Sequence, residues 1–196
     1  MKSGNQHIFM NNKDFIYKRK IKDGGILLVC LMRKSDLKDL LKYANELSRE
    51  KTFVLFQGEK VTLKQERRFV ESHIRAMKQK AGISLLVFLD KELVGITEIS
   101  SKKNSVLRHI GELGISVHRD ARGKGIGLLL MRLIIQETKK RLPHIKILIL
   151  NVFGENVIAQ KLYKKVGFHK FGQLPKGVRH HGKFDSLIYM YKQLRD

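Results

Sequence analysis

A glycine-rich turn is the stretch of this sequence with the clearest chemical meaning. It runs from Arg122 to Gly127 and reads Arg-Gly-Lys-Gly-Ile-Gly. Apolar residues with imperfect alternation precede it, and apolar residues at three- and four-residue spacing follow it, which predicts a strand, a turn and a helix. Three glycines within five residues let bare backbone N–H groups approach a ligand, and a helix start adds unpaired amides and the positive end of a dipole. The stretch therefore predicts a site for a phosphate-bearing ligand.

Two well-known phosphate loops do not fit this spacing. Lys124 lies between the glycines and no Gly-Lys-Ser/Thr follows, so the turn is not a P-loop. The dinucleotide-binding fingerprint needs a third glycine placed later in the sequence. A glycine-rich connection that binds no ligand is the structural alternative.

The turn resembles the acetyl-coenzyme A loop of the GNAT superfamily of N-acetyltransferases. That loop has the pattern Gln/Arg-x-x-Gly-x-Gly/Ala, which Arg122, Gly125 and Gly127 match after a strand that ends at Val117. A second motif, Tyr163-x-x-x-Gly167-Phe168, is similar to the ending of the family's next helix. One predicted helix and one predicted strand separate the two motifs. The resemblance covers residues 80–192 well and the earlier part of the chain only in outline.

The resemblance implies that acetyl-coenzyme A is the co-substrate and that backbone groups make most of its contacts. Two residues of the strand would pair with its pantetheine as with an added strand, and the turn would hold its pyrophosphate. Arg122 and Lys124 add positive charge, and Asn156 either bonds the pantetheine arm, caps the next helix, or does both. The predicted contacts are Ile115, Val117, Arg122, Gly123, Lys124, Gly125, Ile126, Gly127 and Asn156.

Acetyl transfer to a primary amine needs a base for the amine and an acid for the departing thiolate. Tyr163 matches the family's tyrosine that protonates the coenzyme A sulfur. The base is either Glu112, at the start of the strand before the turn, or Glu98 in the preceding strand. Family members that modify protein N-termini often carry a glutamate where this chain has Asn151, and an uncharged amide is not a strong base. The resemblance therefore predicts acetylation of a primary amine, and Asn151 weakens the case that this amine is a protein N-terminus.

The elements that must position these residues follow from hydrophobic periodicity. The fold class expected is a mixed α/β, GNAT-like domain with a central, mostly antiparallel sheet of about seven strands and about four flanking helices. Ser35 is the expected N-cap of the first helix, and Thr62 with Gln65 forms a capping box for the second. Helices are expected near residues 35–49, 62–79, 126–140 and 156–168, and strands near 25–32, 83–89, 93–99, 108–117, 145–152, 168–174 and 183–191. The basic residues 175–182 are expected to form a loop between the last two strands.

The chain is strongly basic. Forty Lys and Arg against eighteen Asp and Glu give a formal net charge of +22, which exceeds what one cofactor requires and raises affinity for nucleic acid. A contact with nucleic acid or the ribosome is thus the alternative to a merely solvated surface. Residues 1–24 are expected to form a basic N-terminal arm, and residues 25–196 a single domain.

The remaining features indicate a cytoplasmic monomer or homodimer. Cys30 is the single cysteine and lies in an apolar run, so it is expected to be buried, and neither a signal peptide nor a membrane span is recognised. Two adjacent histidines, His180 and His181, would point apart on a strand, so no metal site is expected. Apolar residues in 51–59 either pack on the core or line a pocket.

The function expected is direct acetyl transfer from acetyl-coenzyme A to a small-molecule or protein amine in a ternary complex. The alternative is a nucleic-acid- or ribosome-associated module that keeps the fold without activity.

Overall fold

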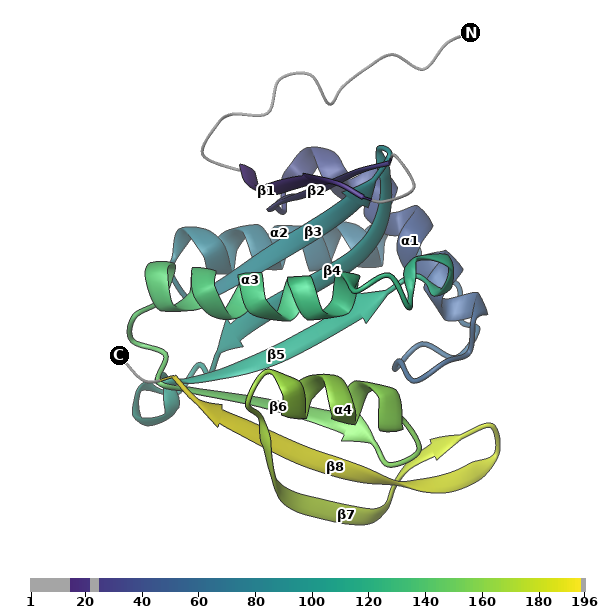
Figure 1. The fold of residues 1–196 in the computed structure, drawn as a ribbon, viewed down its shortest axis with the longest axis vertical. Coiled ribbons are helices and arrows are strands. Elements are labelled where there is room, and N and C mark those ends of the chain that lie inside the picture. Colours follow the sequence, from purple (N-terminus) through teal and green to yellow (C-terminus); the bar gives the residue numbers. More distant parts are fainter. Residues whose placement is uncertain (1–14, 22–24, 195–196) are drawn as a thin grey trace, which may run out of the picture.

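The computed structural model describes residues 15–21 and 25–194, and a twisted sheet of eight strands runs through the described part (Figure 1). The order across the sheet is β1-β2-β3-β4-β5-β6-β8-β7. All neighbours in it are antiparallel except β5 and β6, which is the mixed, mostly antiparallel arrangement that the periodicity predicts. The strands are β1 (Phe15–Lys20), β2 (Ile26–Leu31), β3 (Gly82–Leu89), β4 (Glu92–Ser101), β5 (Ile110–Val117), β6 (Ile147–Phe153), β7 (His169–His180) and β8 (Lys183–Gln193).

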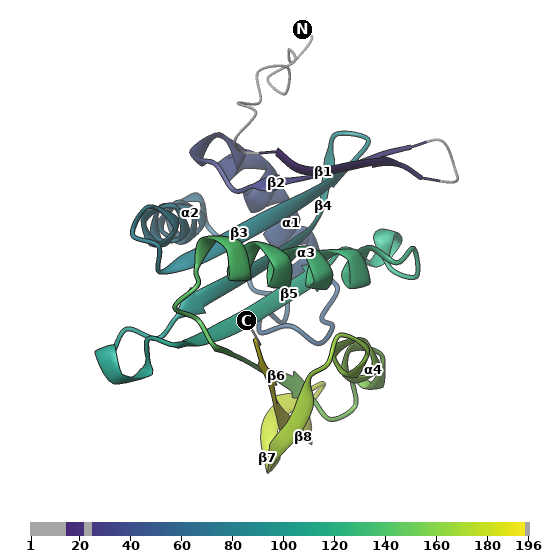
Figure 2. The same cartoon turned by 60° about the vertical axis from the view of Figure 1, so that its left-hand side comes forward.

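Helices cover both faces of the sheet, which explains why its central strands are almost continuously apolar (Figure 2). On one face, Leu40 and Val70 from the first two helices pack with Leu86 of β3. On the other face, Leu130 and Ile134 of the third helix pack with Leu85. The helices are α1 (Leu37–Arg49), α2 (Leu63–Lys78), α3 (Ile126–Arg141) and α4 (Val157–Lys165). Cys30 is buried within the first of these two clusters, as expected.

Strand β1 is the strand that was not expected, in addition to the seven that were. It lies within residues 1–24, the expected basic arm. It pairs antiparallel with β2, with Tyr17 opposite Val29 and Lys20 opposite Ile26. Its side chains are mostly exposed, as befits an edge strand, so its hydrophobic pattern was too weak to predict it. Residues 1–14 and 22–24 of the expected arm, and residues 195–196 of the expected domain, lie outside the described residues.

Helix ends follow local side-chain chemistry at two of three predicted caps. Thr62 and Gln65 form the predicted capping box of α2, and Asn156 caps α4 by accepting a hydrogen bond from the Ala159 amide at 3.1 Å. The Ser35 cap is wrong. A short 3₁₀ turn precedes α1, and in that turn Asp36 accepts hydrogen bonds from the backbone and side chain of Arg33.

The basic residues 175–182 are mostly strand rather than loop. Strand β7 continues through two irregularities to His180, and the reversal takes place at His181 and Gly182, which both have positive φ. A period-2 pattern broken by bulges is hard to recognise in sequence, because the side chains change face at each bulge.

The strands β5 and β6 diverge, and this divergence positions the site. They pair in parallel only from Ile110 opposite Ile147 to Glu112 opposite Ile149. The rest of β5 stays paired with β4, whereas the rest of β6 stays paired with β8. One backbone edge of residues 113–117 therefore lacks a strand partner among the described residues.

In the part of the chain that the structure describes, no helix is both long and apolar enough to span a bilayer.

Candidate active site

The glycine-rich turn presents open backbone at the start of α3. Gly123 and Gly125 have φ values of 75° and 76°, a region that L-amino acids with a Cβ seldom adopt. A Cβ built on either residue would meet no atom of the described chain within 4 Å. Gly125 is the residue before the helix, so the first amides of α3 lie directly behind the turn. Open amides at a helix start suit a pyrophosphate.

The free edge of β5 adjoins this turn. The amide of His118 donates to the carbonyl of Val94 at 2.8 Å, so that residue points its backbone toward β4. Alternate residues of a strand point their backbone groups to opposite edges. Ile115 and Val117 therefore face the divergence from β6, which is the orientation needed to pair with an extended ligand. The Val117 carbonyl already accepts a hydrogen bond from Nε of Arg122 at 2.9 Å.

The guanidinium of Arg122 is held by a residue that sequence reasoning missed. It forms an ion pair with the carboxylate of Glu50, the residue that follows α1, whose side chain is only 6% exposed. The same carboxylate accepts a hydrogen bond from the Arg119 amide at 3.1 Å. Arg122 thus ties the turn to α1 and β5, and a phosphate contact by this side chain stays a prediction. Lys124 is exposed and close in sequence to the open amides.

Glu98 lies on the face of the sheet that α1 and α2 cover. It is half-buried and pairs with Gly114 of β5, and a Cβ at Gly114 would collide with the Glu98 carboxylate. The missing side chain of Gly114 thus lets the carboxylate lie across β5. Burial raises the pKa of Glu98 to about 7. A carboxylate with that pKa is half-ionised near neutral pH, which is the range in which a general base works best.

Glu112 lies on the same face of the sheet as Glu98, two residues before Gly114 on β5, but its environment is different. Its carboxylate pairs with the Lys102 ammonium at 2.5 Å, and half of its side chain is exposed. It lies where β5 is still paired with β6 rather than where the strands diverge. The two candidate bases are therefore distinguished by burial and by position along the strand.

Two hydroxyl groups stand on the same face as Glu98 and were not recognised from sequence. The phenol of Tyr43 on α1 and the hydroxyl of Ser116 on β5 lie 2.9 Å apart. Tyr43 is buried, and that burial raises its pKa well above the ordinary value, so it stays protonated. The negative charge of Glu98 adds to this increase in pKa, which places the two residues in one electrostatic neighbourhood.

Tyr163 comes from the other face. It lies on α4 and is buried in the cluster formed with α3, with its ring 6.2 Å from that of Phe168. Burial raises its pKa to about 12, so the phenol carries its proton throughout the physiological range. Tyr163 and Glu98 therefore lie on opposite faces of the sheet.

Phe53, in the segment between α1 and α2, packs against the end of β6 and the end of β7. The ring of Phe53 lies 5.9 Å from that of Phe153 and 5.1 Å from that of His180. Nε2 of His180 is 3.1 Å from the carbonyl oxygen of Lys51, a hydrogen-bond distance. Packing is thus the correct alternative for Phe53, whereas Leu55 is 86% exposed.

The expectation that His180 and His181 point apart is wrong. The rings of His180 and His181 are 4.0 Å apart, because His181 leaves the strand in a left-handed conformation. Even so, within residues 15–21 and 25–194 no three His, Cys, Asp or Glu side chains gather in a way that would hold a metal ion.

A comparison with known families supplies the identity. The model of the acetyltransferase (GNAT) family matches residues 41–168, which is more than half of the chain. The chain belongs to the GNAT family.

Relatives of this GNAT protein include two curated enzymes of Escherichia coli (strain K12). The L-amino acid N-acetyltransferase AaaT is 30% identical over 117 residues, which are 58% of this chain and 70% of that protein. The L-amino acid N-acyltransferase MnaT is 29% identical over 87 residues, 44% of this chain and 49% of that protein. Among solved structures, a GNAT-family acetyltransferase from Streptococcus pneumoniae is 27% identical with a TM-score of 0.79, over 86% of this chain and 99% of that one.

The GNAT protein is therefore an acetyl-coenzyme A-dependent N-acetyltransferase. The comparisons therefore favour an enzyme over a binding module without activity. The open amides of the turn and the free edge of β5 fit the pyrophosphate and the pantetheine of that co-substrate, respectively.

Proposed function

We propose that this enzyme acetylates the α-amino group of a free L-amino acid, with Glu98 as general base and Tyr163 as general acid. The observation that carries the assignment of the base is the Glu98 carboxylate, half-buried over Gly114 with its pKa raised to about 7. Glu112 is the weaker candidate, because its carboxylate is exposed and neutralised by Lys102.

The chemistry is a direct transfer in a ternary complex. Glu98 takes a proton from the acceptor ammonium, which frees the nitrogen lone pair to bond to the acetyl carbon. The carbon–sulfur bond then breaks, Tyr163 gives its phenolic proton to the departing sulfur, and the new amide nitrogen releases its second proton to solvent. Solvent returns a proton to Tyr163 and removes one from Glu98, so that the cycle leaves the enzyme unchanged. The one cysteine of the chain, Cys30, is buried in β2 and is not positioned to carry an acetyl group.

Two observations support an L-amino acid as the acceptor. The curated relatives AaaT and MnaT act on L-amino acids by name. Asn151 stands where a glutamate is frequent in family members that modify protein N-termini.

A cationic groove between the α1–α2 segment and the β7–β8 hairpin bears on which amino acid is preferred. It has a volume of about 350 Å³ and is lined by Lys51, Gln57, Arg179, His181 and Gly182. Its positive side chains complement a carboxylate and repel an ammonium group. With a net charge of +22, the whole protein adds to this preference. We therefore propose that acidic and neutral L-amino acids are preferred to basic ones. We also propose that the enzyme works in the cytoplasm.

An acceptor panel tests this proposal. Release of the coenzyme A thiol is followed with aspartate, glutamate, alanine and lysine as L-amino acids, with spermidine, and with a peptide that begins with alanine. We expect turnover of free L-amino acids, with kcat/KM at least tenfold higher for aspartate or glutamate than for lysine. Turnover of the peptide or of spermidine alone would contradict the proposed acceptor, although acetyl transfer itself would stand.

Removal of the Tyr163 hydroxyl tests the acid. The change Tyr163→Phe should lower kcat by about a hundred- to ten-thousand-fold, the usual contribution of a general acid. Affinity for acetyl-coenzyme A should change little, since the ring remains in its cluster. The matched control is Tyr189→Phe, which removes a phenol from β8. Equal kcat in Tyr163→Phe and the unmodified enzyme would contradict the assignment.

A further inference from the structure

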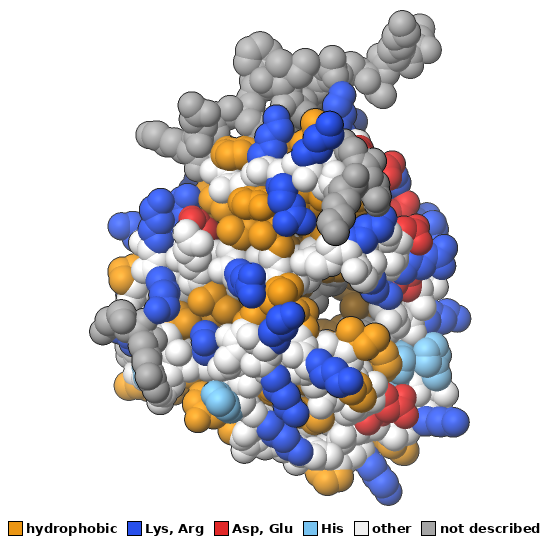
Figure 3. Space-filling model, in the orientation of Figure 1, with side chains coloured by type: hydrophobic (Ala, Val, Ile, Leu, Met, Phe, Trp, Pro, Cys, Tyr) orange, Lys and Arg blue, Asp and Glu red, His pale blue; other side chains and the backbone are white. Residues whose placement is uncertain are grey.

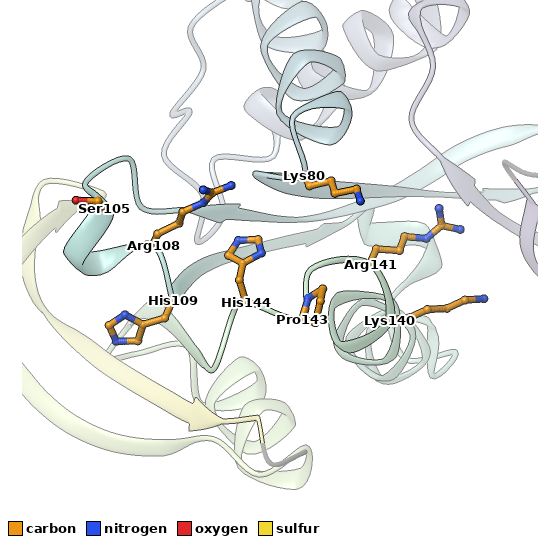
Figure 4. A pocket seen from close by; sticks show the side chains of 8 residues that line it. All are labelled: Lys80, Ser105, Arg108, His109, Lys140, Arg141, Pro143 and His144. Carbon is orange, nitrogen blue, oxygen red and sulfur yellow. The ribbon is translucent and has the colours of Figure 1, made fainter.

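A second hollow lies at the end of α3 remote from the glycine-rich turn. Since α3 has 16 residues, the two ends of the helix are about 24 Å apart. The hollow has a volume of about 580 Å³, and the turn after α2, the segment before β5 and the end of α3 meet around it (Figure 4). Its lining residues are Lys80, Ser105, Arg108, His109, Lys140, Arg141, Pro143 and His144. The acetyl-transfer site uses none of them.

The three segments around this hollow carry basic residues and no acidic ones. Neither Asp nor Glu occurs in residues 75–81, 101–109 or 138–146. The same segments hold ten Lys and Arg residues, and we name these ten the basic end of the molecule: Arg75, Lys78, Lys80, Lys102, Lys103, Arg108, Lys139, Lys140, Arg141 and Lys146. Lys and Arg side chains also outnumber acidic ones over the face drawn in Figure 3.

Carboxylates close to the basic end are already engaged. Glu112 pairs with Lys102 at 2.5 Å, and Glu137 pairs with Arg141 at 2.6 Å. Lys80, Arg108 and Lys140 line the same hollow, so their positive charges add to one another. One physical sign of this field is His144, whose pKa is lowered both by burial and by the positive charge of Arg108.

Gathering like charges costs free energy in the absence of an anion, so the arrangement favours an anionic partner. The partner must also be extended, because the basic residues reach beyond the hollow onto three separate segments. Apolar surface lies beside them, with Val106 76% exposed and Leu107 42% exposed. Phosphates at regular spacing, joined by sugars and bases with apolar faces, match this combination better than a single phosphate ion does.

We propose that the basic end binds the sugar–phosphate backbone of a nucleic acid. The hollow takes one phosphate group between Lys80 and Arg108, and Lys140, whose side chain extends away from these two in Figure 4, contacts a neighbouring phosphate. Binding by phosphate contacts is independent of base sequence and weakens steeply with salt. The site is separate from that of acetyl transfer, so the enzyme can hold a nucleic acid and acetyl-coenzyme A at the same time.

Two matched triple variants of the full chain test this proposal. The first, Lys80→Gln with Arg108→Gln and Lys140→Gln, removes three charges that line the hollow. The control, Lys64→Gln with Arg67→Gln and Lys183→Gln, removes three exposed charges from the start of α2 and the β7–β8 hairpin. Both variants have the same net charge. The stabilisation of each by acetyl-coenzyme A in thermal unfolding confirms that it is folded.

The measurement is fluorescence anisotropy with a 20-nucleotide single-stranded RNA and the DNA of the same sequence, at several salt concentrations. We expect the first variant to bind at least tenfold more weakly than the control. Its salt slope should be smaller by about 1.4, because two phosphate contacts are lost and each removes about 0.7. Equal affinity for RNA and DNA supports backbone binding, and a preference for RNA supports it with a contact to the 2′-hydroxyl.

Three outcomes would overturn the proposal. Equal loss in both triple variants would mean that net charge alone attracts nucleic acid. No loss in the first variant would place the binding elsewhere on the chain. Stabilisation by inorganic phosphate that depends on Arg108, with no affinity for RNA or DNA, would make the hollow a site for a small phosphorylated molecule instead.

Discussion

Replacing Glu98 by Gln should lower kcat/KM for the amino acid acceptor by about a hundred- to ten-thousand-fold, the usual range for loss of a general base. The carboxylate lies over Gly114 where no Cβ intervenes, and burial holds its pKa at about 7. Gln keeps the size and polarity of the side chain but does not accept a proton. Affinity for acetyl-coenzyme A should stay within about threefold, because backbone groups of β5 and the turn make the expected contacts.

Glu112→Gln is the matched control for this prediction. It makes the same chemical change on the same face of the sheet, two residues from Gly114 along β5. Because the Glu112 carboxylate is exposed and pairs with Lys102, its loss should change kcat/KM by less than about threefold. A larger loss in Glu112→Gln than in Glu98→Gln would exchange the roles of the two residues.

The Glu98→Gln variant should be more stable than the unmodified enzyme at alkaline pH. The folded-state pKa of Glu98 is raised from 4.5 to about 7, so the folded chain holds this proton more tightly than the unfolded chain does. The contribution of Glu98 to stability is then greatest below pH 4.5 and falls as pH rises to about 7, by up to about 3 kcal/mol. Gln has no proton to lose and avoids this fall. Urea unfolding at pH 5 and pH 8 should show an advantage of Glu98→Gln at pH 8 only.

Gly125→Val should abolish binding of acetyl-coenzyme A. Gly125 has a φ of 76°, where a β-branched residue is strained, and its Cβ would enter the space into which the first amides of α3 open. No described atom lies within 4 Å of that Cβ, so the valine would meet the ligand rather than the protein. Thermal unfolding with and without millimolar acetyl-coenzyme A measures the loss as a vanished shift of the midpoint.

Gly182→Val provides an unusually close control. Gly182 also has a φ of 76°, and a Cβ there also meets no described atom within 4 Å. Both variants should therefore cost about 1–3 kcal/mol of stability through backbone strain. Gly182 lies in the β7–β8 turn, away from α3, so its variant should keep the acetyl-coenzyme A shift. A shift retained in Gly125→Val, or lost equally in both, would contradict the role of the turn.

Sequence was sufficient for features that depend on local pattern. Glycines at fixed spacing locate the turn, and the 3.6-residue period of Ile126, Leu130 and Ile134 predicts the buried face of α3. Asn156 and the pair of Thr62 and Gln65 cap helices through contacts only three residues apart. Short-range chemistry of this kind requires no knowledge of the fold.

Features that depend on distant segments were not predictable. Glu50 and Arg122 are 72 residues apart, and Tyr43 and Ser116 are 73 apart, so no periodicity links them. The choice between Glu98 and Glu112 also depends on the fold, since it rests on burial and on where β5 leaves β6. In the same way, the basic end is spread over three segments that only the folded chain brings together.

The pH dependence of kcat/KM, compared between the unmodified enzyme and Glu98→Gln, tests the central claim most directly. With an L-amino acid acceptor, log kcat/KM of the unmodified enzyme should rise with pH and bend near pH 7, where Glu98 loses its proton. In Glu98→Gln the residual activity should lack that bend and follow only the ionisation of the acceptor amine. A bend near pH 7 that survives in Glu98→Gln would assign the base to another group and contradict the proposed mechanism.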